Sequence, residues 1–303
     1  MTSDQTSNPR QESLLGAACG GAASFIWALS PLYWKVLDDI PAFETLMHRV
    51  IWSFFFLLPF LVSRGLRHEI FAAVKSWRTL LILLSTTIFI GSNWFVFIWA
   101  INHDYVLQAS LGYYINPLIN VLLGMVFLRE RLRPLQAAAV ILAGVGVLYL
   151  TIQYGRFPWV ALSLAFTFGL YGLIRKVAPI SAVGGLFLEM LFALLPAMAY
   201  LFYLDTRGAG SLFHVSIGID LFLIGTALVT ALPLVLFTLG ARRLRLATVG
   251  FLQYIAPSCY FLLAVFLFRE PISRAQVWTF FLIWAALVFY TIDSMRYYGR
   301  ADH

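Results

Sequence analysis

Two ionisable side chains, Arg49 and Glu189, lie deep inside long apolar segments of the chain. Arg49 follows Ala42 by seven residues, and Glu189 follows Ala182 by seven residues. In a membrane-crossing helix, a rise of about 1.5 Å per residue puts each charge about 10–12 Å deep, within roughly 5 Å of the midplane. A charge at that depth costs roughly 2.5–3.5 kcal/mol on insertion scales. A charged residue that is kept there usually belongs to a substrate or ion pathway. The two residues are therefore candidates for holding a zwitterionic or polar substrate, or for gating against each other. The alternative is a static ion pair between two helices.

Two prolines, Pro117 and Pro257, interrupt apolar segments that also carry polar side chains. A proline inside a helix frees the carbonyl group four residues earlier, here that of Tyr113 and that of Gln253. In lipid such a carbonyl needs a cavity or a polar partner. The two prolines therefore predict hinges beside a substrate site, or alternatively packing kinks sealed by neighbours. Candidate substrate contacts on the same helix faces are Tyr113, Asn116, Gln253 and Tyr260.

Three further residues are candidates for the same site. Asn93 and Trp94 bring an amide and an indole into the segment 79–103, although an asparagine in a membrane helix is more often glue between helices than a ligand contact. His48 precedes Arg49, and adjacent helical residues point about 100° apart, so both cannot face one cavity squarely. His48 is therefore either a titratable gate or a histidine bonded to a neighbouring helix.

The composition shows which elements must position these residues. The chain has 303 residues, of which 61% are apolar and 12% are charged. Soluble domains carry about 25% charge, so a soluble enzyme and a disordered chain are both excluded. Ten segments have the length and apolarity of membrane helices: 13–34, 42–63, 79–103, 105–128, 134–155, 157–174, 181–204, 221–241, 246–268 and 275–292. Because lipid leaves backbone groups no water, an all-α integral membrane protein with ten transmembrane helices is predicted.

Basic residues are distributed unevenly between the two sets of loops. With the N-terminus inside, 15 of the 21 Lys and Arg residues fall on the cytoplasmic side and 5 on the outer side. This bias predicts that both termini are cytoplasmic. It also explains the net charge of +7 without a nucleic-acid partner.

An internal repeat appears when the sequence is shifted by 140 residues. Tyr114-Ile115-Asn116-Pro117 then falls on Tyr254-Ile255-Ala256-Pro257, and Arg129-Glu130 falls on Arg269-Glu270. Each half holds five predicted helices, so the second half enters the membrane in the opposite orientation. We expect two inverted five-helix repeats, residues 1–152 and 153–303. Many secondary transporters have inverted repeats with the substrate between them near the midplane.

The sequence offers little for other functions. It contains no P-loop and no hydrolase or metalloprotease motif. The two cysteines lie apart from other metal-ligand types, so neither a metal site nor a cofactor is predicted. The chain is interpreted as a transporter of a small molecule and not as an enzyme. A membrane-embedded enzyme and a non-transporting receptor or assembly subunit remain the alternatives. Monomer and homodimer are both open.

Several short segments together resemble the RarD family, in the EamA branch of the drug/metabolite transporter superfamily. They are Ser30-Pro31-Leu32-Tyr33-Trp34-Lys35, His48-Arg49-Val50-Ile51-Trp52-Ser53, Asn93-Trp94 with Phe97-Ile98-Trp99-Ala100, Leu111-Gly112-Tyr113-Tyr114-Ile115-Asn116-Pro117 and Gly250-Phe251-Leu252-Gln253-Tyr254-Ile255-Ala256-Pro257. The resemblance covers nearly the whole chain. It implies ten helices in two inverted repeats, a multi-pass place in the bacterial inner membrane, and carriage of small organic molecules such as metabolites or drugs. The family name is tied to chloramphenicol sensitivity.

Overall fold

A computed structural model describes residues 9–103, 105–263, 266 and 273–300. Every regular element within those residues is helical, as the apolar segments predict. The α-helices are α1 (Pro9–Trp34), α2 (Ala42–Leu57), α3 (Arg64–Lys75), α4 (Trp77–Asn102), α5 (Val106–Phe127), α6 (Pro134–Tyr154), α7 (Trp159–Val177), α8 (Ala182–Thr206), α9 (Ile217–Arg243), α10 (Leu246–Gln253), α11 (Ile255–Leu262) and α12 (Arg274–Arg300). Two short 3-10 helices, η1 (Lys35–Leu37) and η2 (Leu58–Val62), follow α1 and α2.

Nine helices in the described part of the chain are long and apolar enough to cross a membrane, and the stretch Leu246–Cys259 adds a shorter apolar helix. The fold is therefore that of an all-α membrane protein with about ten crossings. Large apolar side chains on the outside of the bundle fit this setting: Ile88, Leu195 and Leu228 are between 51% and 77% exposed. Apolar side chains of this kind pack favourably against lipid acyl chains.

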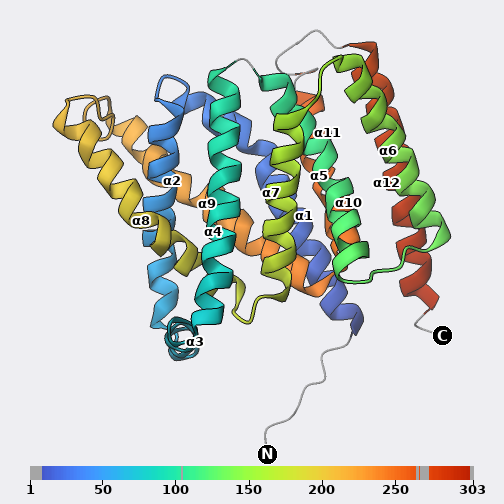
Figure 1. Cartoon of the computed structure of the whole chain (residues 1–303), viewed down its shortest axis with the longest axis horizontal. Coiled ribbons are helices and arrows are strands. Elements are labelled where there is room, and N and C mark those ends of the chain that lie inside the picture. Colours follow the sequence, from blue (N-terminus) through green and yellow to red (C-terminus); the bar gives the residue numbers. More distant parts are fainter. Residues whose placement is uncertain (1–8, 104, 264–265, 267–272, 301–303) are drawn as a thin grey trace, which may run out of the picture.

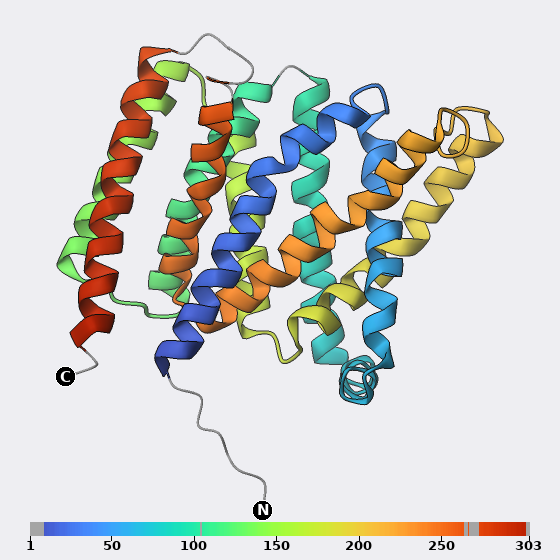
Figure 2. The ribbon, with the colours of Figure 1, turned by 180° about the vertical axis from the view of Figure 1, so that it is seen from behind.

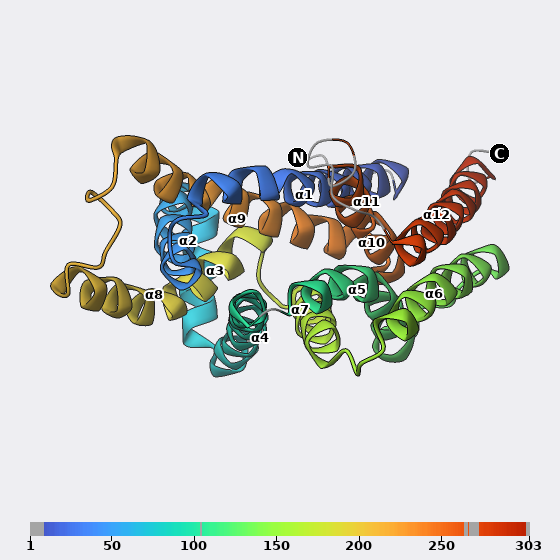
Figure 3. The same ribbon diagram turned by 90° about the horizontal axis from the view of Figure 1, so that it is seen from above.

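Most helix contacts join the two halves of the chain. The most extensive pairs include α1 with α9, α5 with α7, α6 with α12, and α2 with both α8 and α9. Figure 1 shows the bundle from one side, and Figure 2 shows α1 and α9 side by side from behind. In the view from above, α6 and α12 form a pair at one edge and α8 lies at the opposite edge (Figure 3). Residues from both halves therefore meet along the middle of the molecule.

The two ends of the bundle need names. The start of α1 and the end of α12 lie at the same end, at the bottom of Figure 1, which we call the basal end. The opposite end, where α2 begins after η1, is the apical end.

The structure differs from the predicted helices in two places. The segment 64–75, expected to be a loop, forms the helix α3, which lies across the basal end and is seen end-on in Figure 1. The segment 246–268, expected to be one helix, is divided between α10 and α11 at Tyr254. The break directly follows Gln253, the residue whose carbonyl Pro257 frees, so it lies where a proline at position 257 removes the helical hydrogen bond.

Pro117 does not divide its helix. The helix α5 continues through this proline from Val106 to Phe127. The two proline-bearing segments therefore differ, with one continuous helix in the first half and two short helices in the second. They pack closely, because a Cβ atom on Gly250 of α10 would lie only 2.6 Å from the Pro117 carbonyl oxygen.

Candidate functional site

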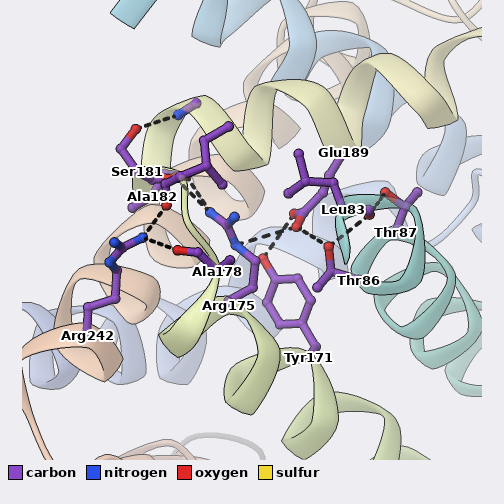
Figure 4. A network of polar contacts seen from close by, with 12 residues as sticks. Leu83, Thr86, Thr87, Tyr171, Arg175, Ala178, Ser181, Ala182, Glu189 and Arg242 are labelled. Atoms are coloured by element: carbon purple, nitrogen blue, oxygen red, sulfur yellow. Dashed lines mark hydrogen bonds and ion pairs between the residues drawn. The ribbon is translucent and has the colours of Figure 1, made fainter. Parts of the chain in front are cut away.

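Glu189 lies in the second turn of α8 and is completely buried. Its Oε1 accepts a hydrogen bond from Thr86 Oγ1 of α4 at 2.6 Å, and its Oε2 accepts one from Tyr171 of α7 at 3.2 Å. Oε1 also lies 3.4 Å from Nε of Arg175 at the end of α7. Figure 4 shows the three partners arranged around the carboxylate. Because both oxygens are engaged, the charge of Glu189 is satisfied by the protein.

Arg175 is also completely buried. Its Nη2 donates hydrogen bonds to the carbonyl groups of Ser181 at 3.2 Å and Ala182 at 2.8 Å, at the start of α8 (Figure 4). Gly185 makes room for it, since a Cβ atom on Gly185 would lie only 1.8 Å from Arg175 Nη1. Arginine suits this position because its planar guanidinium can serve several acceptors at once.

Other side chains hold the short loop 178–181, which joins α7 to α8. Arg242 of α9 donates hydrogen bonds to the carbonyl groups of Ala178 and Ile180 (Figure 4). The backbone N–H of Ser181 donates to Glu69 of α3. Together with Glu189 and Arg175, these contacts close the basal end between α3, α7, α8 and α9, and we call them the basal network.

Arg49, in the middle of α2, has a different environment. Its Nε donates a hydrogen bond to Thr230 Oγ1 of α9 at 3.0 Å. The guanidinium carbon lies 5.0 Å from the ring centres of Trp34 of α1 and Trp94 of α4. The side chain of Tyr113 of α5 lies in its vicinity. Helices from both halves of the chain thus converge on this side chain, which is partly exposed.

Sequence reasoning made Arg49 the counterpart of Glu189 across one cavity, but the structure pairs Glu189 with Arg175 instead. Among the described residues, no carboxylate lies within ion-pair distance of Arg49. The physical reason is connectivity. The four-residue loop 178–181 joins the end of α7 to the start of α8, and Arg175 reaches Glu189 across this short connection.

His48 lies at the apical side of Arg49 and is buried. Its Nε2 is 3.8 Å from a Glu44 oxygen, and neither ring nitrogen has a hydrogen-bond partner in the described part of the chain. Glu44 accepts hydrogen bonds from the backbone N–H of Ser211 at 2.6 Å and from its hydroxyl at 3.0 Å. These contacts, which we call the apical contacts, tie the start of α2 to the loop between α8 and α9.

The remaining amides join helices. Asn93 Nδ2 donates to the Leu164 carbonyl at 2.8 Å and to Thr167 Oγ1 at 3.0 Å, which links α4 to α7. Asn116 donates to Gln253 Oε1 at 3.0 Å, and so does Asn120 at 2.5 Å.

The two contacts of Gln253 link α5 to α10 beside the helix break. Pro117 and Pro257 are buried in the same region. The side chain of Tyr260 lies outside the described residues.

Sequence reasoning missed several residues of this region. Arg175 was counted with the loop charges, because it lies next to Lys176 at the end of an apolar segment. Thr86 and Tyr171, which bind Glu189, and Thr230, which binds Arg49, carry no charge that would single them out. Trp34 was named only within one of the family-like segments. The available signal for Arg175 was its position only seven residues before Ala182, where α8 begins.

A bundle of membrane-crossing helices, with a polar centre formed jointly by both halves, defines a multi-pass membrane transporter. The EamA-like transporter family model matches residues 14–152. An "Uncharacterized transporter" of Vibrio cholerae is 44% identical over 297 residues, covering 98% of this chain and 96% of that protein. Protein RarD of Escherichia coli strain K12 is 42% identical over 274 residues, covering 90% and 93% of the two chains. The chain therefore belongs to the RarD family of the drug/metabolite transporter superfamily.

Two further comparisons extend this result. A "Chloramphenicol-sensitive protein RarD" of Pseudomonas aeruginosa is 32% identical over 280 residues, covering 91% of this chain and 93% of that protein. One solved crystal structure superimposes with a TM-score of 0.69 at 19% identity, covering 93% of this chain and 98% of the other, which shows a shared fold. Because the relatives are named as transporters, the chain is a membrane transporter for a small-molecule substrate and not an enzyme.

Proposed function

We propose that the protein is a secondary transporter that moves small organic molecules across the bacterial inner membrane by alternating access. The observation that carries this proposal is the convergence of α1, α4, α5 and α9 on Arg49 of α2, near the middle of the bundle. An ionisable side chain at that depth is costly and is usually retained for function. The substrate would bind between the two halves, at Arg49, Trp94 and Tyr113.

The helix contacts support the inverted-repeat part of the proposal. In such a repeat α7 would correspond to α1, α4 to α9, and α8 to α2. Exchange of the halves then converts the contact of α1 with α9 into that of α7 with α4, and the contact of α2 with α9 into that of α8 with α4. All four of these contacts are present. Two related halves that meet around one site can rock to expose it to each side in turn.

The two ends of the bundle supply the gates in this mechanism. The basal network closes one side of the site through Glu189, Arg175 and Arg242. The apical contacts between Glu44 and Ser211, with His48 alongside, close the other side. We propose that transport breaks one set of contacts while the other stays formed. Pro117, Pro257 and the helix break at Tyr254 would act as the hinges between them.

Gln253, in the second half of the chain, lies in this hinge region. Its Oε1 accepts hydrogen bonds from Asn116 and Asn120. The amides Asn116 and Gln253 therefore stay candidates for substrate contact only in a state that breaks these bonds. Asn93, bonded to α7, is assigned a structural role in the state described here.

Flux into proteoliposomes tests the transport function directly. A related protein is named for chloramphenicol sensitivity, so chloramphenicol is the first compound to test. We expect protein-dependent uptake that saturates with concentration and is lost in Arg49→Gln. Empty liposomes and liposomes with Arg156→Gln, an exposed arginine at the apical end, are the controls. Absence of protein-dependent flux for chloramphenicol and for a broad metabolite mixture would argue against a carrier.

The proposed orientation places the basal end, with both termini, in the cytoplasm. The basic residues of the basal loops and the positive-inside rule support this choice. A reporter enzyme that is active only outside the membrane should stay inactive when fused after His303 and become active when fused into the loop 207–216. Activity at the C-terminal fusion would contradict the orientation.

A further inference from the structure

The two charged side chains, Glu189 and Arg49, differ in how many of their polar atoms remain available to a ligand. Glu189 is fully buried, and its two oxygens are occupied by Thr86, Tyr171 and Arg175. Arg49 has one hydrogen bond, from Nε to Thr230, and its side chain is partly exposed. The guanidinium carries five N–H donors. Its two terminal nitrogens have no acceptor among the described residues.

The other acidic groups near the site are also engaged. Glu44 accepts two hydrogen bonds from Ser211 and faces His48. Asp220 accepts a hydrogen bond from the backbone N–H of Phe213. In this state Glu189 is fully buried and bound by the protein, so we do not extend the substrate site from Arg49 to Glu189.

The surroundings of Arg49 favour an anion. Burial without a counter-charge is costly for a guanidinium, and the indole faces of Trp34 and Trp94 offset only part of that cost. A carboxylate bound to the terminal nitrogens would supply the missing charge through paired hydrogen bonds. Trp34, Trp94 and the partly exposed ring of Tyr113 offer apolar surface for the rest of such a ligand.

We propose that Arg49 binds the acidic group of the substrate, and that the transported class is small organic anions, namely carboxylates with an apolar or aromatic body. This inference rests on the proposed transport function and names its substrate class. Glu189 takes no part in binding and acts within the basal network. Trp34, Trp94 and Thr230 fix the direction of the guanidinium.

Matched ligands that differ in one functional group test the charge preference. The probes are benzoate, benzamide and benzylamine, together with the corresponding naphthalene and cyclohexane compounds. Binding to the purified full-length protein in detergent is measured by calorimetry and by thermal shift. We expect each carboxylate to bind at least tenfold more tightly than its neutral amide, and the amines to show no binding. Equal affinity for amide and carboxylate, or binding of amines alone, would overturn the inference.

Variants assign the preference to Arg49. Arg49→Gln should lose the tenfold preference for the carboxylate, and Arg49→Lys should keep only part of it, because lysine cannot make the bidentate contact. Arg156→Gln removes an exposed arginine and should bind as wild type does. If Arg49→Gln does not fold, Thr230→Val gives a second test, since it frees the guanidinium to turn and should weaken carboxylate binding. A preference unchanged in Arg49→Lys and Thr230→Val would place the anion site elsewhere.

Flux and binding together separate this inference from the transport function. If chloramphenicol or another neutral compound shows protein-dependent flux while no carboxylate binds or competes, the transport function stands and the anion site is refuted. If carboxylates bind through Arg49 but do not enter proteoliposomes, the anion site stands and the transport function is refuted. Failure of every carboxylate in all three series to bind would overturn the anion site.

Discussion

Arg49 and Glu189 occupy equivalent sequence positions in the two halves of the chain, yet the protein surrounds them in different ways. Glu189 has an ion-pair partner, two hydroxyl donors and no exposed surface. Arg49 has one hydroxyl acceptor, two aromatic faces and partial exposure. The two positions, 140 residues apart, therefore have different surroundings.

The difference indicates that the two charges have different tasks. A buried ion pair contributes little net stability relative to apolar residues, but it becomes very costly when one partner is removed. Glu189 and Arg175 therefore hold the start of α8 in one position. A charged side chain that lacks a counter-charge in the empty protein can obtain one from a bound ligand. Arg49 is in that position, and the following predictions test the contrast.

Loss of the Glu189 carboxylate should have the largest effect. Glu189→Ala leaves Arg175 buried without its counter-charge, and we expect a loss of about 3–5 kcal/mol in the free energy of unfolding. Glu189→Gln is the matched variant, since its one amide oxygen can still accept from either Thr86 or Tyr171, and it should fall between Glu189→Ala and wild type. Reversible unfolding in mixed detergent micelles measures both. A Glu189→Ala protein of wild-type stability would contradict the structural role.

A pair of threonine variants compares the two charges through their hydroxyl partners. Thr86→Val removes the hydrogen bond to Glu189 and should cost about 1.5–3 kcal/mol, because that bond goes to a buried charged group. Thr230→Val removes the hydrogen bond from Arg49 and should cost less, because the partly exposed guanidinium can find water. Equal losses of unfolding free energy in the two variants would contradict the proposed difference between Glu189 and Arg49.

Gly185 tests the space that Arg175 requires. The added methyl group of Gly185→Ala would lie 1.8 Å from Arg175 Nη1 and force the guanidinium out of its place. We expect a loss of about 1–3 kcal/mol, typical of overpacking. Gly91→Ala in α4 is the control, because its Cβ would meet nothing within 4 Å and should leave stability unchanged or slightly higher. The same unfolding measurement applies, and indistinguishable curves for the two variants would show that Arg175 does not need this space.

The smallest expected effect concerns the indoles beside Arg49. Trp94→Leu removes one aromatic face and should cost about 0.5–2 kcal/mol through the lost cation–π contact. A double-mutant cycle with Arg49→Met isolates that contact from the loss of packing area. A coupling energy of zero between the two positions would show that Trp94 packs beside Arg49 without stabilising it.

The fold was largely predictable from the sequence, because lipid permits few alternatives. Segments of about twenty apolar residues must form helices there, and nine such helices and a shorter one are found in the described residues. The helix α3 was missed for the same reason. Its twelve residues are too short and too polar to cross a membrane, although Leu66, Ile70 and Ala73 recur at helical spacing and lie toward the protein.

The candidate site was predictable in position but not in pairing. Depth follows from counting residues along a helix, so Arg49 and Glu189 could be placed in the apolar segments from sequence. Which charges meet depends on loop length and helix packing, and the hairpin between α7 and α8 delivers Arg175 to Glu189. The break between α10 and α11 was predictable, because it directly follows Gln253, whose carbonyl Pro257 frees. The contact beside the break, from the Tyr254 hydroxyl to the Tyr114 carbonyl at 3.3 Å, was not.

The central claim is that Arg49 binds the substrate, whereas Glu189 binds no substrate and stabilises the basal network. The most direct test measures unfolding free energy and flux on the same preparations of Arg49→Gln and Glu189→Gln. Arg49→Gln should unfold within about 1 kcal/mol of wild type, as expected when a partly exposed charge is neutralised, and yet lose transport. Glu189→Gln should lose measurably more stability. Wild-type flux in Arg49→Gln, or a loss of stability in Arg49→Gln as large as that in Glu189→Gln, would contradict the account.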